Sequence, residues 1–260
     1  MEIELGCWTR PWWHFTLEEA LRGIAAAGFR FVGLTPFDDG PPFSADSTEE
    51  DIARLKAAVE GHGLVPRVVF GNPDLSRELE EAVRLFQREI ERVQWLGLTH
   101  IVLLGTAEEQ QYEKWYAAVE RCLDFAGERG VMLLLKPHGG LSALADDLLR
   151  AVERFHHPNF GVCYDPGNIY YYTGEKAEED LPRVVEHVRA MCIKDELGGK
   201  HGEVMITPGT GLVDFGRIFS ILEDGGFSGP CWVECVGGTS LEEINAEAHK
   251  AREFVVRVAA

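Results

Sequence analysis

The chain has 260 residues, with 25 Lys and Arg against 43 Asp and Glu, so its formal net charge is −18. An acidic chain of this kind repels phosphate backbones, which excludes a general nucleic-acid binder. Its 45% apolar and 26% charged residues are typical of a globular protein that buries its core without disulfides. We expect a single domain over residues 1–260, since one closed α/β barrel often has this length.

The cysteines and the first residues bear on the cellular compartment. The six cysteines form no CxxC pair and no zinc-finger spacing, so we expect reduced thiols. The opening MEIELGCW lacks the basic region and apolar core of a signal peptide. No apolar run reaches the ~18 residues that cross a bilayer. The expectation is a cytoplasmic protein without a membrane partner.

Short apolar runs alternate with longer amphipathic runs from the start of the chain. Thr16, with Glu19 three residues later, has the spacing of a capping box and predicts a helix that ends at Gly28. Ser47 and Glu50 predict the start of the second helix. In this half we expect strands at 3–8, 29–35, 64–70 and 99–104 and further helices at about 75–96 and 108–129.

The second half continues the same alternation. Asp214 is expected to cap a helix that runs to about 224, and Ser240 with Glu243 the last helix. The remaining strands are expected at 131–136, 159–165, 188–194 and 229–235, with helices at 141–155 and 179–187. Eight strand–helix units in strict alternation require parallel strands and predict a closed (β/α)8 TIM barrel. The alternative, an open doubly wound sheet, would want a glycine fingerprint after the first strand, and GCWTRPWW is not one.

Four successive predicted strands end in an ionisable residue: Lys136, Asp165, Lys194 and Glu234. In such a barrel the carboxyl ends of the strands form the mouth that carries the chemistry. Because side chains alternate along a strand, His138 shares the lumen face of Lys136, and Cys192 that of Lys194, whereas Asp195 points away or into the loop. Aromatic residues follow the earlier strands: Trp8, Trp12, Trp13, Phe15, Phe37 and Phe70. Aromatic rings beside charged side chains suit a sugar, because its C–H face packs on rings while its hydroxyl groups need hydrogen bonds.

The chain resembles the sugar phosphate isomerase/epimerase group, the xylose isomerase-like barrels. The resemblance covers about residues 1–257 and is carried by KPHGG, DPGN, IKDE, PGTGLVDF and GPCWVE. It implies a divalent metal held by a Glu, an Asp, a His and a Glu on the last four strands. Asp165 and Glu234 match two of these ligands. Lys136 stands at the position of the first Glu, Cys192 at that of the His, and Asn168 where a substrate-binding His is often found.

These departures leave two interpretations of the site open. In one, the site is metal-free and the Lys136 ammonium replaces part of the charge of a divalent ion between Asp165 and Glu234. In the other, Mn, Zn or Mg is bound by Asp165 and Glu234, completed by His138, His201 or Cys192.

The function that the resemblance implies is a sugar isomerase or epimerase that removes a proton next to a carbonyl. Glu234 is the expected base, Lys136 or a metal the stabiliser of the oxyanion, and His138 a proton shuttle. Five residues are expected to contact the substrate: Lys194, Asn168, Trp8, Trp12 and His201. The glycine-rich loop 195–213 is a candidate lid. No glycine-rich phosphate loop is present, so a phosphate group is not expected.

Three other functions compete with this one. Lys136 could form a Schiff base with a keto-sugar in a lyase or aldolase, and an elimination from an oxidised glycoside would need the same proton abstraction. A DNA-repair nuclease of the same superfamily is disfavoured by the net charge of −18. The departures at the ligand positions also allow a catalytically inactive sugar-binding barrel. Relatives are often dimers or tetramers, so a homo-oligomer is an alternative to a monomer.

Overall fold

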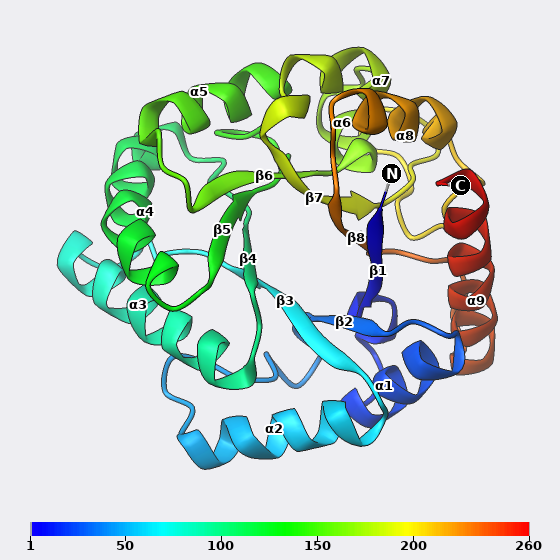
Figure 1. Ribbon diagram of the computed structural model, residues 1–260, viewed down its shortest axis with the longest axis horizontal. Helices are drawn as coiled ribbons and strands as arrows, with labels where there is room; N and C mark the ends of the chain where they lie inside the picture. The colour runs from blue at the N-terminus through cyan, green and yellow to red at the C-terminus, as the bar shows by residue number, and fades with distance from the viewer. Residues whose placement is uncertain (1, 260) are drawn as a thin grey trace.

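The strands close into a complete parallel barrel in chain order (Figure 1). The structure is a computed structural model and describes residues 2–259. The last strand pairs with the first, so Gly6 is in register with both Phe31 and Trp232. This confirms the predicted (β/α)8 barrel and excludes the open sheet. The strands are β1 (Ile3–Trp8), β2 (Phe31–Leu34), β3 (Val65–Gly71), β4 (His100–Leu103), β5 (Met132–Leu135), β6 (Phe160–Tyr164), β7 (Val188–Ile193) and β8 (Gly229–Val233).

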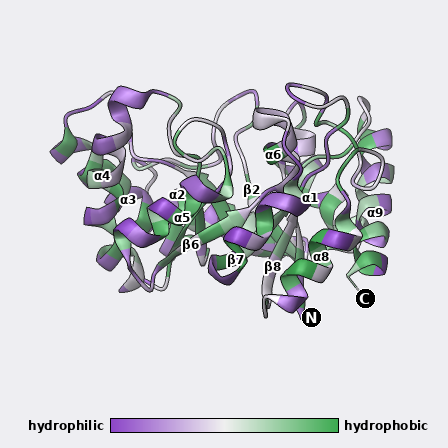
Figure 2. Cartoon of the chain, turned by 90° about the horizontal axis from the view of Figure 1, so that it is seen from above, coloured by the Kyte–Doolittle hydropathy of each residue, from purple (hydrophilic) through white to green (hydrophobic). Residues whose placement is uncertain are grey.

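Helices form the outer layer of the barrel and carry both hydrophilic and hydrophobic residues (Figure 2). Their apolar side faces the strands, as expected for helices that cover a parallel sheet. The α-helices are α1 (Leu17–Ala26), α2 (Glu49–Gly61), α3 (Leu79–Leu96), α4 (Tyr112–Gly127), α5 (Ala145–Phe155), α6 (Pro166–Thr173), α7 (Ala177–Asp180), α8 (Phe215–Asp224) and α9 (Leu241–Val258). The 3₁₀ turns are η1 (Arg10–Trp12), η2 (Glu109–Gln111), η3 (Leu181–Arg183) and η4 (Val185–His187).

Side-chain caps fix where several helices begin. The capping boxes of Thr16 with Glu19 and of Ser240 with Glu243 are both formed, and Asp214 caps α8. The prediction for the second helix was one residue early. Thr48 and Asp51 form the box of α2, whereas the Ser47 hydroxyl accepts a hydrogen bond from the Ser44 amide in the preceding turn. Local spacing therefore located these helix starts to within a residue.

Other helix boundaries differ more from the prediction. The helix expected from residue 75 begins at Leu79, because the Asp74 carboxylate accepts from the amide and hydroxyl of Ser76 and holds a turn there. The helix expected over 179–187 is replaced by α7 and two 3₁₀ turns around Pro182. One helix was missed altogether. α6 starts directly after β6, with the Asp165 side chain accepting from the Asn168 amide and Pro166 in the first turn.

The barrel interior is filled below its mouth by large side chains. Trp8 stacks on Phe70 with ring centroids 4.1 Å apart, and Trp232 meets Trp8 edge-on. Two glycines provide the room for these rings: a Cβ at Gly6 would lie 2.4 Å from the Trp232 ring, and one at Gly33 2.6 Å from the Trp8 ring. This packing makes a solid floor, so a ligand can enter only from the carboxyl end of the strands.

All six cysteines are buried and unpaired, as predicted. Among residues 2–259, no helix combines the length and the hydropathy that a membrane span requires.

Candidate active site at the barrel mouth

The four ionisable strand ends meet in one buried cluster. Lys136, directly after β5, places its Nζ 2.8 Å from Oδ2 of Asp165 and also contacts Oε2 of Glu234. Nζ of Lys194 donates to Oε1 of Glu234 at 2.9 Å. No more than 5% of any of these four residues is exposed. The predicted convergence of β5 to β8 is therefore confirmed.

The residues on either side of Lys194 alternate as the strand period predicts. Cys192 faces the lumen, where its Sγ lies 3.7 Å from Sγ of Cys163. Asp195 faces the loop instead. Its carboxylate accepts four backbone amide bonds, from Glu196 and Val213 on Oδ1 and from Gly209 and Gly211 on Oδ2. One carboxylate thus ties down both ends of the loop 195–213.

A cavity of about 320 Å³ opens above this cluster. Most of its polar lining comes from the later strands, with Arg10 after β1 as the exception, and Phe70 alone of the six aromatic residues expected near the earlier strands is among its lining residues. The segment 195–213, the candidate lid, contributes Val204 to the wall. The lining residues are Arg10, Pro36, Phe70, Leu104, Lys136, His138, Asn168, Tyr171, Tyr172, Lys194, Val204 and Glu234.

His138 and Asn168 occupy the wall beside Lys136. Nε2 of His138 lies 3.1 Å from the Tyr172 hydroxyl. Burial, followed by the charges of Lys136 and Lys194, lowers the pKa of His138 to about 4, so its imidazole is neutral near neutral pH. Nδ2 of Asn168 donates to the Pro137 carbonyl at 2.7 Å and fixes the backbone between Lys136 and His138. Asn168 therefore positions the end of β5.

Charge pairing dominates the electrostatics of the cluster. Burial alone would lower the pKa of Lys136, but the Asp165 and Glu234 carboxylates outweigh it and raise this pKa well above its usual value. Burial likewise opposes the ionisation of Glu234, but Lys136, Lys194 and Arg10 together hold the Glu234 pKa well below its usual range. The pKa of Asp165 is raised, because burial outweighs the attraction of the two lysines. Glu234 is thus the firmly ionised carboxylate of the pair.

The donor set at the mouth does not fit a divalent metal. Asp165, Cys192 and Glu234 each offer an atom within 4.8 Å of the others, but the Lys136 ammonium contacts both carboxylates in the same space. The third donor in this set is the Cys192 sulfur, which is fully buried and lies 3.7 Å from Sγ of Cys163. A positively charged ammonium repels a divalent cation. The two carboxylates of Asp165 and Glu234 are thus complementary to the positive charge of Lys136 that lies between them.

Neither histidine proposed as a further metal ligand joins this set. His138 pairs with Tyr172, and His201 is exposed on the loop, with its ring centroid 5.4 Å from that of Tyr171. The backbone amide of His201 donates to the Tyr171 carbonyl, which holds the loop against α6. The structure therefore assigns His201 a place at the rim, outside the residues that line the cavity.

The two tryptophans expected to contact substrate lie elsewhere. Trp8 is fully buried below the cavity, with Phe70 stacked on it. Trp12 is turned outward by η1 into the helical layer, where its Nε1 donates to Oδ1 of Asn245 on α9 at 2.9 Å. Its ring also packs against Gly23 of α1. The expected contact of Trp12 with substrate is thus replaced by packing between β1 and the outer helices.

The sequence interpretation missed Arg10 as a site residue. Arg10 lies in η1, two residues beyond the end of β1, and its Nε is 3.8 Å from Oε1 of Glu234. Strand parity could have found it, because Trp8 faces the lumen and Arg10 follows at the same period. Tyr171 and Tyr172 of α6 were not among the predicted site residues either, and both line the cavity.

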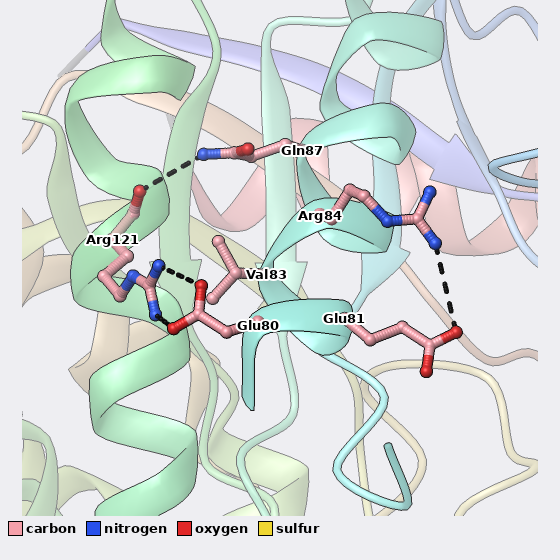
Figure 3. A pocket seen from close by; sticks show the side chains of 6 residues that line it. All are labelled: Glu80, Glu81, Val83, Arg84, Gln87 and Arg121. Carbon is pink, nitrogen blue, oxygen red and sulfur yellow. Dashed lines mark hydrogen bonds and ion pairs between the residues drawn. The ribbon is translucent and has the colours of Figure 1, made fainter. Parts of the chain in front are cut away.

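A larger hollow, of about 760 Å³, lies on the outer surface between α3 and α4 (Figure 3). Its charges pair with each other: Arg121 makes two hydrogen bonds to Glu80, at 2.6 and 2.7 Å, and Arg84 lies near Glu81. The hollow contains no buried polar cluster comparable to that at the mouth. The buried cluster of Lys136, Asp165, Lys194 and Glu234 therefore lies at the carboxyl end of the barrel and not at this hollow.

Comparisons with known proteins agree with this architecture. The chain is 25% identical to an L-ribulose-5-phosphate 3-epimerase of Escherichia coli O1:K1, over 91% of this chain and 88% of that protein. It is 28% identical to an inosose dehydratase of Erwinia tasmaniensis, over 55% of each chain. The solved structure of D-psicose 3-epimerase from Clostridium cellulolyticum H10 superposes with a TM-score of 0.77, at 17% identity and over 99% of both chains. The sequence model described as xylose isomerase-like TIM barrel matches residues 21–255, and the chain belongs to this family.

Proposed function

We propose that this protein is an isomerase or epimerase of a sugar derivative that moves a proton next to a carbonyl group without a divalent metal. The observation that carries the proposal is the Lys136 ammonium, held between Asp165 and Glu234 at the floor of a cavity. The full-length similarity to an L-ribulose-5-phosphate 3-epimerase supports the reaction class.

The reaction needs a cation where the carbonyl oxygen sits. Removing the proton from the neighbouring carbon leaves an electron pair that becomes negative charge on that oxygen. A fixed positive charge in a buried site stabilises this oxyanion far more than water does. Lys136 and Lys194 both line the cavity, and each ammonium carries three N–H donors. They are the groups proposed to bind the oxyanion.

Two groups are proposed to handle the proton. Glu234 is ionised and lines the cavity, so it can accept the proton from carbon. Its lowered pKa makes it a weak base, and catalysis would then depend on the lysines stabilising the oxyanion in the same step. The neutral His138 and the Tyr172 hydroxyl, 3.1 Å apart, can return a proton from the wall of the cavity. Return to the same carbon gives epimerisation, and return to the adjacent one gives isomerisation.

The second candidate function is a dehydratase, a type of lyase. It shares the first step, after which a hydroxyl group leaves from the next carbon. The similarity to an inosose dehydratase over 55% of the chain favours this alternative. A lyase mechanism through a Schiff base on Lys136 is less well supported than dehydration. A nucleophilic amine must be neutral, and the carboxylates of Asp165 and Glu234 keep the Lys136 amine protonated.

Hydrogen exchange tests the proposal directly. The protein, treated with a chelator, is incubated in D2O with a panel of keto- and aldo-sugars and sugar acids, and NMR follows deuterium at the carbon next to the carbonyl. Deuterium incorporation together with a new epimer or isomer is expected for at least one compound, and Glu234→Gln should slow it by about 100-fold or more. Loss of water from the labelled compound would identify the dehydratase instead. Exchange that requires added metal would overturn the metal-free reaction, and no exchange at all would leave a binding protein.

A further inference from the structure

Cations outnumber anions around the cavity, although the chain as a whole carries a formal charge of −18. Arg10, Lys136 and Lys194 supply three positive charges to its lining, and Asp165 and Glu234 supply two negative charges to the cluster. From this excess we infer that the substrate carries a carboxylate group, bound by Arg10 and Lys194 at the mouth. The inference rests on the proposed function and names its substrate class, an acidic sugar derivative.

The charge count holds under the least favourable assumption. With both carboxylates ionised, the cluster retains one unbalanced positive charge. The four charges that are almost completely buried, those of Lys136, Lys194, Asp165 and Glu234, balance one another, so the excess positive charge is that of Arg10. A cation without a full set of partners can be satisfied by a ligand of opposite charge.

Arg10 is the cation whose pairing is least complete. Its Nε lies 3.8 Å from Glu234, beyond hydrogen-bond distance, and this buried nitrogen has no hydrogen-bond partner among residues 2–259. Arg10 also interacts with the thiol of Cys235, a weak acceptor, and with the charge of Asp165. Another arginine of the chain shows a guanidinium that is paired with a carboxylate through two hydrogen bonds. Arg154 donates two hydrogen bonds to Glu113, at 2.8 and 2.7 Å.

The side chain of Arg10 is placed to receive a ligand from solution. It is 43% exposed, whereas that of Glu234 is 3% exposed, so Arg10 extends from the buried cluster toward the opening. A planar guanidinium matches a carboxylate with two parallel hydrogen bonds. An acid group bound there would leave the carbonyl end of the molecule over Lys136. This orientation would place the reacting carbon beside Glu234.

The surroundings favour a carboxylate over a phosphate ester. One unbalanced positive charge matches a monoanion, while a phosphate ester carries more than one negative charge near neutral pH. Phosphates are commonly bound by free amides at a helix start. The α6 start at this mouth is already occupied, because Asp165 accepts from the Asn168 amide at 2.9 Å. Asp165 thus already takes up one of the amides that such a cradle would use at the start of α6.

Binding measurements separate this inference from the proposed function. Calorimetry compares 2-keto-D-gluconate, D-fructose and D-fructose 6-phosphate as probes on the wild-type protein, Arg10→Gln, Arg10→Lys and the exposed control Arg217→Gln. The wild type should bind the acid about tenfold more tightly than the neutral ketose, since hydrogen bonds between charged groups contribute more than neutral ones. Arg10→Gln should remove this preference, Arg10→Lys should keep part of it, and Arg217→Gln should leave it unchanged.

Each other result counts against the inference. Equal affinities for acid and ketose, or no binding of the acid, would overturn it, and tighter binding of the phosphate ester would replace the carboxylate by a phosphate. The same preference in Arg10→Gln would exclude Arg10 as its source. Because binding is measured without turnover, proton exchange into neutral sugars alone would leave the proposed function standing while this inference fails. Binding of the acid without any proton exchange would support this inference while the proposed function fails.

Discussion

Lys136 and Asp165 form an ion pair across neighbouring strands, with Nζ 2.8 Å from Oδ2 and both residues almost completely buried. The same carboxylate has a second task, because its Oδ1 accepts the Asn168 amide and starts α6. One side chain thus joins the charged cluster to the helix that supplies Tyr171 and Tyr172 to the cavity. Breaking this ion pair should therefore alter both the charged cluster and the part of the cavity wall that α6 supplies.

Lys136→Met is expected to destabilise the protein strongly. The substitution removes the cation and leaves Asp165 and Glu234 buried with one partner fewer, a loss of about 3–5 kcal/mol in the free energy of unfolding. Urea denaturation near pH 7 measures it. The matched control is Lys176→Met, because Lys176 is exposed and forms a surface ion pair with Glu179, with Nζ 3.4 Å from Oε1. A change below about 0.5 kcal/mol in the free energy of unfolding is expected for this control. Similar losses in both variants would mean that the buried pair has no special role.

Lys136→Glu is expected to create a three-carboxylate metal site at the barrel mouth. It replaces the ammonium by a third carboxylate beside Asp165 and Glu234, whose mutual repulsion should destabilise the metal-free variant. Manganese should restore stability, by about 2.7 kcal/mol at a concentration of 100 times its dissociation constant. Thermal unfolding with and without Mn²⁺ checks this. Stabilisation of the wild-type protein by the same addition would contradict the ammonium-filled site.

The sequence predicted the barrel and the charged mouth because both depend on short-range patterns. Apolar runs mark the strands, and the ionisable residues that end the last four of them follow directly in the chain. Strand parity then placed His138 and Cys192 correctly on the lumen side. These features require only the period of a strand and the closure of the sheet.

The features that were missed depend on contacts between distant parts of the chain. Trp12 turns outward because Asn245 on α9 accepts its N–H, a partner 233 positions away. α6 was missed because Asp165 was considered only as a ligand and not as a helix cap. Lys136 lies between the carboxylates of Asp165 and Glu234, a contact among three strands that the spacing of these residues could not predict, so the sequence left the metal-free and metal-bound alternatives open.

His138 should remain neutral well into the acid range. The pKa of His138 is lowered by burial to about 4 in the folded protein, against an ordinary value of 6.5, so the unfolded chain binds more protons between these two pH values. Stability should therefore rise with pH across this window and level off above it. His138→Gln should flatten that rise, as seen by urea denaturation at pH 4.5 and 7.

If neutral His138 takes part in turnover, the acid limb of kcat/KM should lie nearer pH 4 than 6.5. A limb at 6.5 that persists in the variant would exclude it.

Asp195→Asn should loosen the loop that covers the mouth. The carboxylate accepts four backbone amides, and an amide side chain would offer one oxygen while its NH2 group faces amide N–H donors. Leaving two buried N–H groups unpaired should cost about 2–4 kcal/mol in the free energy of unfolding. Because Val204 of this loop lines the cavity, the KM should rise more than kcat falls.

Limited proteolysis within 195–213, urea denaturation and steady-state kinetics measure these effects of Asp195→Asn. The control is Asp214→Asn, since Asp214 is exposed and its side chain caps α8 by accepting the Arg217 amide, a role that asparagine fills about equally well. We expect faster cleavage and a higher KM in Asp195→Asn and wild-type behaviour in Asp214→Asn. A stable Asp195→Asn variant with an uncut loop and an unchanged KM would show that this carboxylate does not hold the loop over the cavity.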